Sequence, residues 1–341
     1  MGCNMKSVTL MFVIAMTLFV ALAVPSRLAA QDAQVQNQQK HTRYAIKVLD
    51  TLGGTQGEAW GLNNRGLVAG PSTLPGDTAL DAFLWSKGVI TDLGSLGGPI
   101  SLTFTKPNER GEDVGYSNTS TLDPNGEDFC NGLGTFLICL PFVWKKGVMT
   151  ALPTLGGTNG QALGINNRGQ IVGQAETPNV DPCSPFALQV EAVVWRDHQI
   201  EQVLPPLGGT VAVANAINDN GDAVGLSGCI TGNVYAVLWQ HGTPINLGTL
   251  GGVFGNIPFA INNRGQVIGQ SDLPGDTLHH GFLWQNGVMT DLGGLPGLPT
   301  TQADDINNQG QVVGVAQDAN SDESSGMRSA TGIDVQRPSR P

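Results

Sequence analysis

A short recurring phrase constrains the fold of this chain more than any other feature. It reads INNRGQIVGQ at 165–174 and INNRGQVIGQ at 261–270. Related forms, with Asn first and Gly fourth, begin at Asn63, Asn108, Asn218 and Asn307. Self-similarity on this scale is typical of repeat architectures, so the chain is predicted to repeat one structural unit six times.

Two further signatures recur in a fixed order with the first. One is an apolar run that ends in Trp, at Trp85, Trp144, Trp195, Trp239 and Trp284. The other is a Leu-Gly phrase, at 91–98, 150–157, 201–209, 245–252 and 290–297, with an early copy at 48–54. Glycine is abundant, with 47 copies, and aromatic residues make up 6% of the chain. This composition favours short strands and tight turns over long helices.

Each signature has a physical interpretation. Asn at the first position and Gly at the fourth suit a type I turn that closes a hairpin, because Gly accepts the positive φ needed there. The Trp run predicts a strand, and Asn286-Gly287 after Trp284 predicts a tight hairpin. Asp197-His198 lacks this Gly, so a different turn is expected there. The Leu-Gly-Gly phrase is expected to be a flexible exit from the unit.

The repeat therefore contains four strands in about 45 residues, the length of a β-propeller blade. A solenoid, the alternative, would normally repeat faster and with fewer strands per turn. We predict an all-β propeller of about six four-stranded blades. No Trp run follows the last copy of the first signature, so the sixth blade is expected to be incomplete. Tyr44–Leu49 is expected to be the outer strand that closes the ring, which would remove exposed sheet edges.

The amino terminus predicts export. Residues 7–24 are almost wholly apolar, and Leu28-Ala29-Ala30 offers small residues for cleavage. An uncleaved membrane anchor is the alternative, since eighteen residues nearly span a bilayer. The predicted organisation is a signal peptide at 1–30, a polar linker at 31–43, the repeat domain at 44–316 and a disordered tail at 317–341. We expect a secreted, monomeric protein without membrane contact after cleavage, with a periplasmic or cell-surface location as alternatives.

Charge and cysteine content limit the partners, disulfides and cofactors that can be expected. The net charge is −11 and no Lys/Arg stripe is present, so nucleic acid is not an expected partner. Apart from Cys3, the cysteines are Cys130, Cys139, Cys183 and Cys229, an even number that suggests disulfides in an exported chain. Cys130 and Cys139 would close a short loop, and Cys183 and Cys229 would join neighbouring repeats, but three pairings are possible. No C-x-x-C spacing is present, and neither a metal nor a cofactor is expected.

The three signatures in this order resemble the HAF-type extracellular repeat proteins, a bacterial group of exported repeats without settled activity. The resemblance covers about residues 44–316. The eponymous His-Ala-Phe is absent, and its nearest forms are Asp81-Ala82-Phe83 and His280-Gly281-Phe282. The resemblance implies export and repetition, and it implies no chemistry.

Candidate binding residues are few. The loops between the second and third strands are longest in the second and third repeats, and insertions on one face often mark a binding surface. Functionless loop variation is the alternative. The five regularly placed Trp residues are expected to pack between blades, whereas Trp60 breaks the pattern and is a candidate for exposure. The candidates are Trp60, Asp128, Phe129, His279 and His280; solvated loop histidines are the plainer interpretation of the last two.

No catalytic motif is found. The sequence has neither an H-E-x-x-H helix motif nor a G-x-S-x-G elbow, and its acids are too scattered to choose a pair for glycoside hydrolysis. No catalytic residue is proposed, and the chain is expected not to be an enzyme. We expect a secreted module that binds a protein or glycan at the loop-rich face of the propeller. A structural or matrix protein without a specific ligand is the first alternative, and a propeller enzyme is the second.

Overall fold

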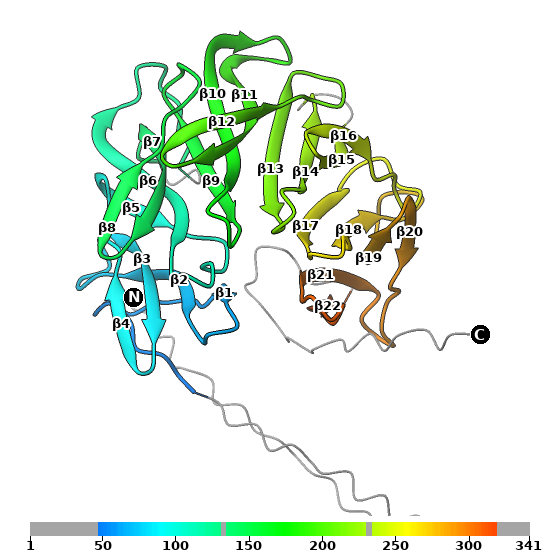
Figure 1. Ribbon diagram of the computed structural model, residues 1–341, viewed down its shortest axis with the longest axis horizontal. Coiled ribbons are helices and arrows are strands. Elements are labelled where there is room, and N and C mark those ends of the chain that lie inside the picture. Colours follow the sequence, from blue (N-terminus) through cyan, green and yellow to red (C-terminus); the bar gives the residue numbers. More distant parts are fainter. Residues whose placement is uncertain (1–46, 131–133, 230–233, 319–341) are drawn as a thin grey trace, which may run out of the picture. The chain divides into compact units, whose positions relative to one another are not determined.

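The computed structural model describes residues 47–130, 134–229 and 234–318, which form strands joined by turns (Figure 1). The chain divides into two units, 1–47 and 48–341, and of the first unit only Lys47 is described. Among the described residues no helix is long and apolar enough to cross a membrane. The predicted all-β class is confirmed.

The first three blades each contain four strands in chain order. Blade 1 comprises β1 (Gly61–Leu62), β2 (Val68–Thr73), β3 (Leu80–Ser86) and β4 (Val89–Asp92). Blade 2 comprises β5 (Gly97–Leu102), β6 (Asp113–Leu122), β7 (Leu137–Lys145) and β8 (Val148–Ala151), and a parallel bridge between Leu80 and Ile100 joins it to blade 1. Blade 3 comprises β9 (Gly160–Ile165), β10 (Ile171–Asp181), β11 (Ser184–Arg196) and β12 (Gln199–Leu204).

The remaining blades follow around the axis in the same order (Figure 1). Blade 4 comprises β13 (Val211–Ile217), β14 (Ala223–Gly228), β15 (Val234–Gln240) and β16 (Thr243–Asn246). Blade 5 comprises β17 (Ile257–Ile261), β18 (Val267–Asp272), β19 (His279–Gln285) and β20 (Val288–Asp291). Blade 6 has only β21 (Thr300–Ile306) and β22 (Val312–Gln317) among the described residues. The fold is a β-propeller, as predicted, and within the described residues its sixth blade is incomplete.

The predicted closing strand, Tyr44–Leu49, is not present in the part of it that the structure describes. Residues 47–49 form no strand and Val48 is 87% exposed, while 44–46 lie outside the described residues. The chain that follows already pairs with blade 1, because the backbone N–H of Gly54 donates to the Thr73 carbonyl at 3.0 Å. Of the predicted tail, Gln317 ends β22, and 319–341 also lie outside the described residues.

Hairpin turns between the first two strands have the predicted conformation. In the repeat that begins at Asn218, Gly221 has a φ of 91° and donates its N–H to the Asn218 carbonyl at 3.1 Å. The turns after the Trp runs correct one expectation. Asn286 and Gly287 have φ values of 53° and 84°, and Asp197 and His198 adopt the same conformation at 49° and 64°. Blade 3 therefore uses the same turn without glycine, because the geometry of the flanking strands fixes it.

The Leu-Gly-Gly phrases are tightly packed links and not flexible exits, which corrects the second expectation. A Cβ on Gly252 would lie 2.4 Å from the Cβ of Asp272, and one on Gly157 would lie 2.4 Å from that of Glu176. The backbone N–H of Leu250 also donates to Ser271 Oγ at 2.8 Å. Glycine is required because the link runs directly against the end of the second strand.

Apolar side chains form a separate core between each pair of consecutive blades. Trp195 and Trp239 are fully buried in two of these clusters, and their indole N–H groups donate to the carbonyls of Pro153 and Pro205. Trp284 and, partly buried, Trp144 also belong to such clusters, whereas Trp85 belongs to none of them, so the predicted packing role is confirmed for four of the five Trp positions. Among the described residues, none of the apolar clusters joins blade 6 to blade 1.

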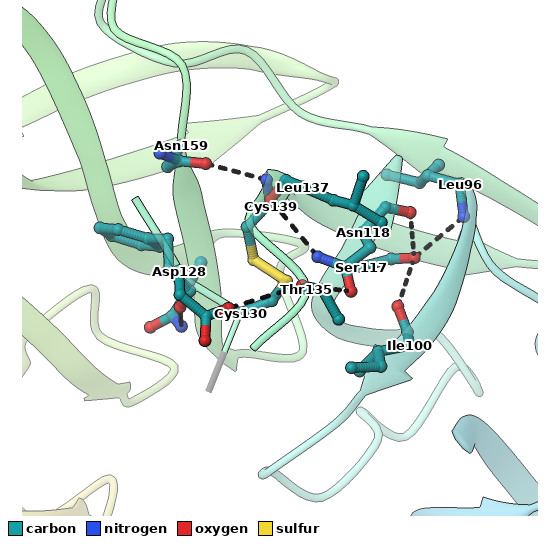
Figure 2. The surroundings of a disulfide bond; sticks show 12 residues. Leu96, Ile100, Ser117, Asn118, Asp128, Cys130, Thr135, Leu137, Cys139 and Asn159 are labelled. Carbon is teal, nitrogen blue, oxygen red and sulfur yellow. Dashed lines mark hydrogen bonds between the residues drawn. A yellow bond between two sulfur atoms is a disulfide. The ribbon is translucent and has the colours of Figure 1, made fainter. Parts of the chain in front are cut away.

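Two disulfides secure the longer loops, which confirms the expectation of disulfides. Cys130–Cys139 closes the loop of blade 2, and Cys183–Cys229 links blade 3 to blade 4. Figure 2 shows the first bridge beside Asn159 of blade 3, whose Oδ1 accepts the Cys139 N–H at 2.9 Å. The bridge therefore lies at a contact between two blades.

Candidate functional site

A ladder of asparagine side chains runs through the six hairpin turns next to the axis. In the first five turns, the first Asn donates from Nδ2 to the backbone carbonyl of the first Asn in the following repeat. The five bonds are Asn63 to Asn108 at 3.0 Å, Asn108 to Asn166 at 3.3 Å, Asn166 to Asn218 at 2.9 Å, Asn218 to Asn262 at 3.1 Å and Asn262 to Asn307 at 3.0 Å. One amide per repeat thus ties each blade to the next.

The same asparagines shape their own turns. Asn218 Oδ1 accepts the backbone N–H groups of Asn220 and Asp222, both at 2.9 Å, and the other five repeats have the equivalent pair. Only a short side chain with an oxygen acceptor and an N–H donor performs both tasks, which explains why Asn recurs at this position.

A second ladder involves the next residue of each turn. Its backbone N–H donates to the side-chain oxygen of the equivalent residue in the following repeat, as from Asn167 to Asp219 Oδ1 at 2.8 Å and from Asp219 to Asn263 Oδ1 at 2.8 Å. The acceptors in the series are Glu109, Asn167, Asp219, Asn263 and Asn308. Although burial opposes it, the hydrogen bonds from Asn263 and Asn167 lower the pKa of Asp219 below its usual value.

Both ladders stop at blade 6. Asn307 Nδ2 donates to Gln311 Oε1 of its own turn at 2.7 Å, and no ladder bond between Asn307 and Asn63 occurs among the described residues. Instead, Lys106 Nζ of blade 2 reaches Asp305 Oδ1 of blade 6 at 2.9 Å. The other four repeats have Gly or Ala at this position, two residues before the first Asn. Both partners are 45% exposed, so this ion pair adds little stability and its charges remain accessible.

The six turns surround a cavity of about 390 Å³ on the axis. Its wall contains the ladder residues of every repeat and a ring of aliphatic side chains, Leu62, Ile165, Ile217, Ile261 and Ile306. Among its charged side chains, Glu109, Asp219 and Asp305 outnumber Lys106. The cavity therefore offers amide and carboxylate groups and disfavours anions.

A second cavity of about 360 Å³ lies between the turns of blades 4 and 5 and shares Ile261 with the axial cavity. Its lining includes Asp222, Gln240, Arg264 and Trp284. The face that carries the Asn turns is therefore hollowed at two adjacent places. The sequence had pointed to the opposite, loop-rich face.

Two buried acids near these turns have altered ionisation. Glu112 lies between Arg110 and Lys145, each 2.6 Å away, and their hydrogen bonds outweigh burial and lower the pKa of Glu112 to about 2. Burial raises the pKa of Asp113 to about 7, although Val114 N–H and Thr103 Oγ1 donate to its Oδ1. Asp113 Oδ2 is buried without a hydrogen-bond partner. The other blades have Val, Ile or Ala at the position of Asp113.

Trp60 has the partial exposure that the sequence suggested, and it forms an aromatic stack. Its ring lies 4.3 Å from that of Phe104, which is 43% exposed, and Phe104 in turn stacks on the buried Tyr116. The indole N–H of Trp60 donates to Glu58 Oε2 at 2.7 Å. Trp60 thus differs from the Trp residues of the blade cores.

The loop candidates of blade 2 hold their own loop. Asp128 Oδ2 accepts the Gly134 N–H at 2.5 Å, and the carbonyl of Phe129 accepts from Gln161 of blade 3 at 3.1 Å (Figure 2 shows Asp128 beside the disulfide). Both residues are partly buried. These contacts give Asp128 and Phe129 a structural role in the loop of blade 2.

The histidine candidates lie at the start of β19 in blade 5. His280 Nδ1 bonds to Asp291 at 2.8 Å, and His279 lies close enough to Asp272 to interact electrostatically with its carboxyl group. The five candidates therefore occupy blades 1, 2 and 5 and are not brought together in one site. No group of three or more His, Cys, Asp or Glu side chains suited to a metal occurs within the described ranges.

Lys106, Asp305 and Asp222 were missed by the sequence analysis. Each departs from what most repeats have at its position, which an alignment of the six repeats would have revealed. The search for known motifs did not reveal them, because none of them belongs to one.

No family model matches the chain, and no curated protein matches it. Among solved structures, it is similar to the β-propeller domain of the Trilobed protease from Pyrococcus furiosus, with 10% identity, a TM-score of 0.49 and coverage of 78% of each chain. It is also similar to a puromycin-hydrolyzing peptidase of Mycobacterium tuberculosis, with 13% identity and a TM-score of 0.43, covering 78% of this chain and 43% of that one. A third is Aleuria aurantia lectin in complex with α-methyl-L-fucoside, with 8% identity and a TM-score of 0.38, covering 77% and 95%.

These comparisons correct the expectation that the chain is not an enzyme. Two of the three structures named above belong to a protease and a peptidase, so the expectation of a non-enzymatic chain is withdrawn. An enzymatic role is not established either. The chain spans less than half the length of the peptidase that it matches.

Proposed function

We propose that the chain is an exported β-propeller that binds a polar ligand, a peptide or a glycan, on the face formed by its Asn turns. The observation that carries this proposal is the axial cavity of about 390 Å³, to which all six repeats contribute. A concave site with a few converging polar groups is the usual form of a ligand site. The excess of carboxylates in its wall favours an uncharged or cationic ligand.

Export rests on the apolar segment 7–24, and the two disulfides are compatible with an oxidising compartment. Membership of the HAF-type repeat group remains part of the proposal, resting on the three recurring signatures. We keep the monomeric state as a prediction.

The test is a variant that fills the cavity without breaking the ladders. Gln309 lines the cavity with an exposed side chain, and only its backbone N–H takes part in the turn, donating to Asn307 Oδ1. Gln309→Trp should abolish binding on glycan and peptide arrays, whereas Gln309→Ala should retain it. Asp128→Ala, on the loop of blade 2, is the control for the opposite face. Loss of binding in Asp128→Ala together with full binding in Gln309→Trp would move the site to the loop-rich face.

A further inference from the structure

Asp222 is a buried carboxylate with one unpartnered oxygen at the wall of the second cavity. The residue is 5% exposed. Its Oδ2 accepts from Asn218 Nδ2 at 3.2 Å, whereas Oδ1 is buried without a hydrogen-bond partner. His241 Nδ1 lies 3.9 Å from Oδ1, too far for a hydrogen bond, and its side chain is 82% exposed. A buried acceptor left in this state costs free energy unless a donor reaches it.

Blade 2 shows what completes such a carboxylate. Glu112 occupies the same place in its repeat, four residues after the first Asn, and its side chain is 6% exposed. Arg110 and Lys145 each approach its carboxylate to 2.6 Å. In blade 4 the residues at the positions of Arg110 and Lys145 are Asn220 and Gln240, neither of which carries a charge. Blade 4 therefore keeps the acid and lacks both cations.

The space that the missing cations leave open is accessible. Asp222 and Gln240 line the cavity of about 360 Å³, and Gln240 itself is exposed. Arg264 is the cationic side chain in the same wall, but its guanidinium donates to Gln266 Oε1 at 2.7 Å. A ligand that enters here lies beside Asp222, whose buried Oδ1 lacks a hydrogen-bond donor, and beside a bound guanidinium.

We infer that Asp222 binds a cationic nitrogen of the ligand, an ammonium or guanidinium group such as a Lys or Arg side chain of a peptide. The ligand's nitrogen would take the place that Lys145 occupies in blade 2. A charge-assisted hydrogen bond to a buried carboxylate is among the stronger polar contacts in proteins. This inference rests on the proposed function in placing the ligand on the Asn-turn face, since the two cavities share Ile261.

The test uses fluorescence anisotropy with labelled peptides that contain Lys or Arg, and with the same peptides after acetylation of Lys. The wild-type chain should bind the cationic peptides and lose the acetylated ones. Asp222→Asn keeps an oxygen for Asn218 and removes the charge, and it should weaken binding by about tenfold or more. Glu112→Gln is the matched control in blade 2, and it should leave peptide affinity unchanged in protein that remains folded.

A second variant supplies the missing cation from within the chain. Gln240→Lys places an ammonium where blade 2 has Lys145, so it should block cationic peptides while raising the thermal unfolding temperature. Gln240→Met is the control without charge. Because Gln240 is exposed, neither change threatens folding.

The outcomes separate this inference from the proposed function. Peptide or glycan binding that Gln309→Trp abolishes but Asp222→Asn and Gln240→Lys leave intact overturns the role of Asp222 and retains the axial site. Binding that both Asp222 and Gln240 variants abolish but Gln309→Trp leaves intact supports Asp222 and overturns the axial site. Equal binding of acetylated and unmodified peptides overturns the cationic ligand, and no binding on any array overturns both proposals.

Discussion

His280 and Asp291 bond to each other across β19 and β20, with Nδ1 and Oδ1 2.8 Å apart. Asp81 and Asp92 hold the equivalent positions in blade 1, since Phe83 pairs with Asp92 as Phe282 pairs with Asp291. Two acids thus face each other where blade 5 has a histidine and an acid. Burial, followed by the charge of Asp92, raises the pKa of Asp81 to about 6.

Replacing Asp81 with Asn should therefore stabilise the propeller at pH 8. Removal of the repulsion is expected to raise the free energy of unfolding by about 1 kcal/mol after solvent screening, and to change it little at pH 4. Urea denaturation of the variant and the wild type at both pH values measures this. Asp92→Asn relieves the same repulsion, so the two gains should not add; a gain of equal size at both pH values would contradict the explanation.

The whole propeller should be most stable near pH 5. The pKa values of Asp81, Asp113 and Glu176 are raised to about 6, 7 and 7, in each case chiefly by burial. A raised carboxyl pKa means that the folded state holds the proton more tightly than the unfolded chain does. The contribution of these three groups to the free energy of unfolding is therefore complete below about pH 4 and is lost as the pH rises through 6 to 7. Glu112, with its pKa lowered to about 2, acts oppositely: its contribution is present above about pH 4.5 and is lost towards pH 2.

Denaturant titrations from pH 3 to pH 9 test this profile. The free energy of unfolding is expected to fall between pH 5 and pH 8, and Asp113→Asn should flatten part of that fall. A free energy that increases over this interval would show that these buried acids are not protonated in the folded state.

The turn at Asp197-His198 should gain stability from glycine. His198 has a φ of 64° and an exposed side chain, so its Cβ strains the backbone without providing packing. His198→Gly is expected to stabilise the chain by about 0.5–1 kcal/mol. Gly287→Ala at the same place in blade 5 is the mirror experiment, because a Cβ there contacts nothing within 4 Å and only φ opposes it. Thermal denaturation should move in opposite directions for the two variants, and a common direction would exclude backbone strain as the cause.

The sequence predicted the fold well because its regular signals are local. Asn218 and Gly221 define their turn by contacts within four residues, so repetition of that pattern was enough to predict hairpins and blades. The Leu-Gly-Gly links were misinterpreted because Gly252 is needed for its approach to Asp272, a tertiary contact that no local pattern reveals. An alignment of the repeats would have marked Asp222 as unusual, but its unpaired oxygen depends on the tertiary contact with the strand of Gln240, where blade 2 has Lys145.

The position of an asparagine along the ladder should determine how much it contributes to the free energy of unfolding. Asn218→Ala would remove the bond from Asn218 to the buried Asn262 carbonyl, and it would leave the N–H groups of Asn220 and of the buried Asp222 without their side-chain acceptor. A loss of about 2–4 kcal/mol is expected. Asn307→Ala, at the exposed end of the ladder, removes bonds only within its own turn and should cost about 1 kcal/mol. Chemical denaturation of both variants measures the difference, and equal losses would show that the bonds between repeats contribute nothing.

The two disulfides should differ in their effect on stability. Cys130–Cys139 closes a loop with a sequence separation of 9, and Cys183–Cys229 closes one of 46. If the bridges act by restricting the unfolded chain, their removal should cost about 3 and about 4 kcal/mol, respectively. Paired Cys→Ser variants, compared by urea denaturation without reductant, test this order. A larger loss for Cys130/Cys139 would show that the contact of this loop with Asn159 of blade 3, and not chain restriction, dominates its contribution.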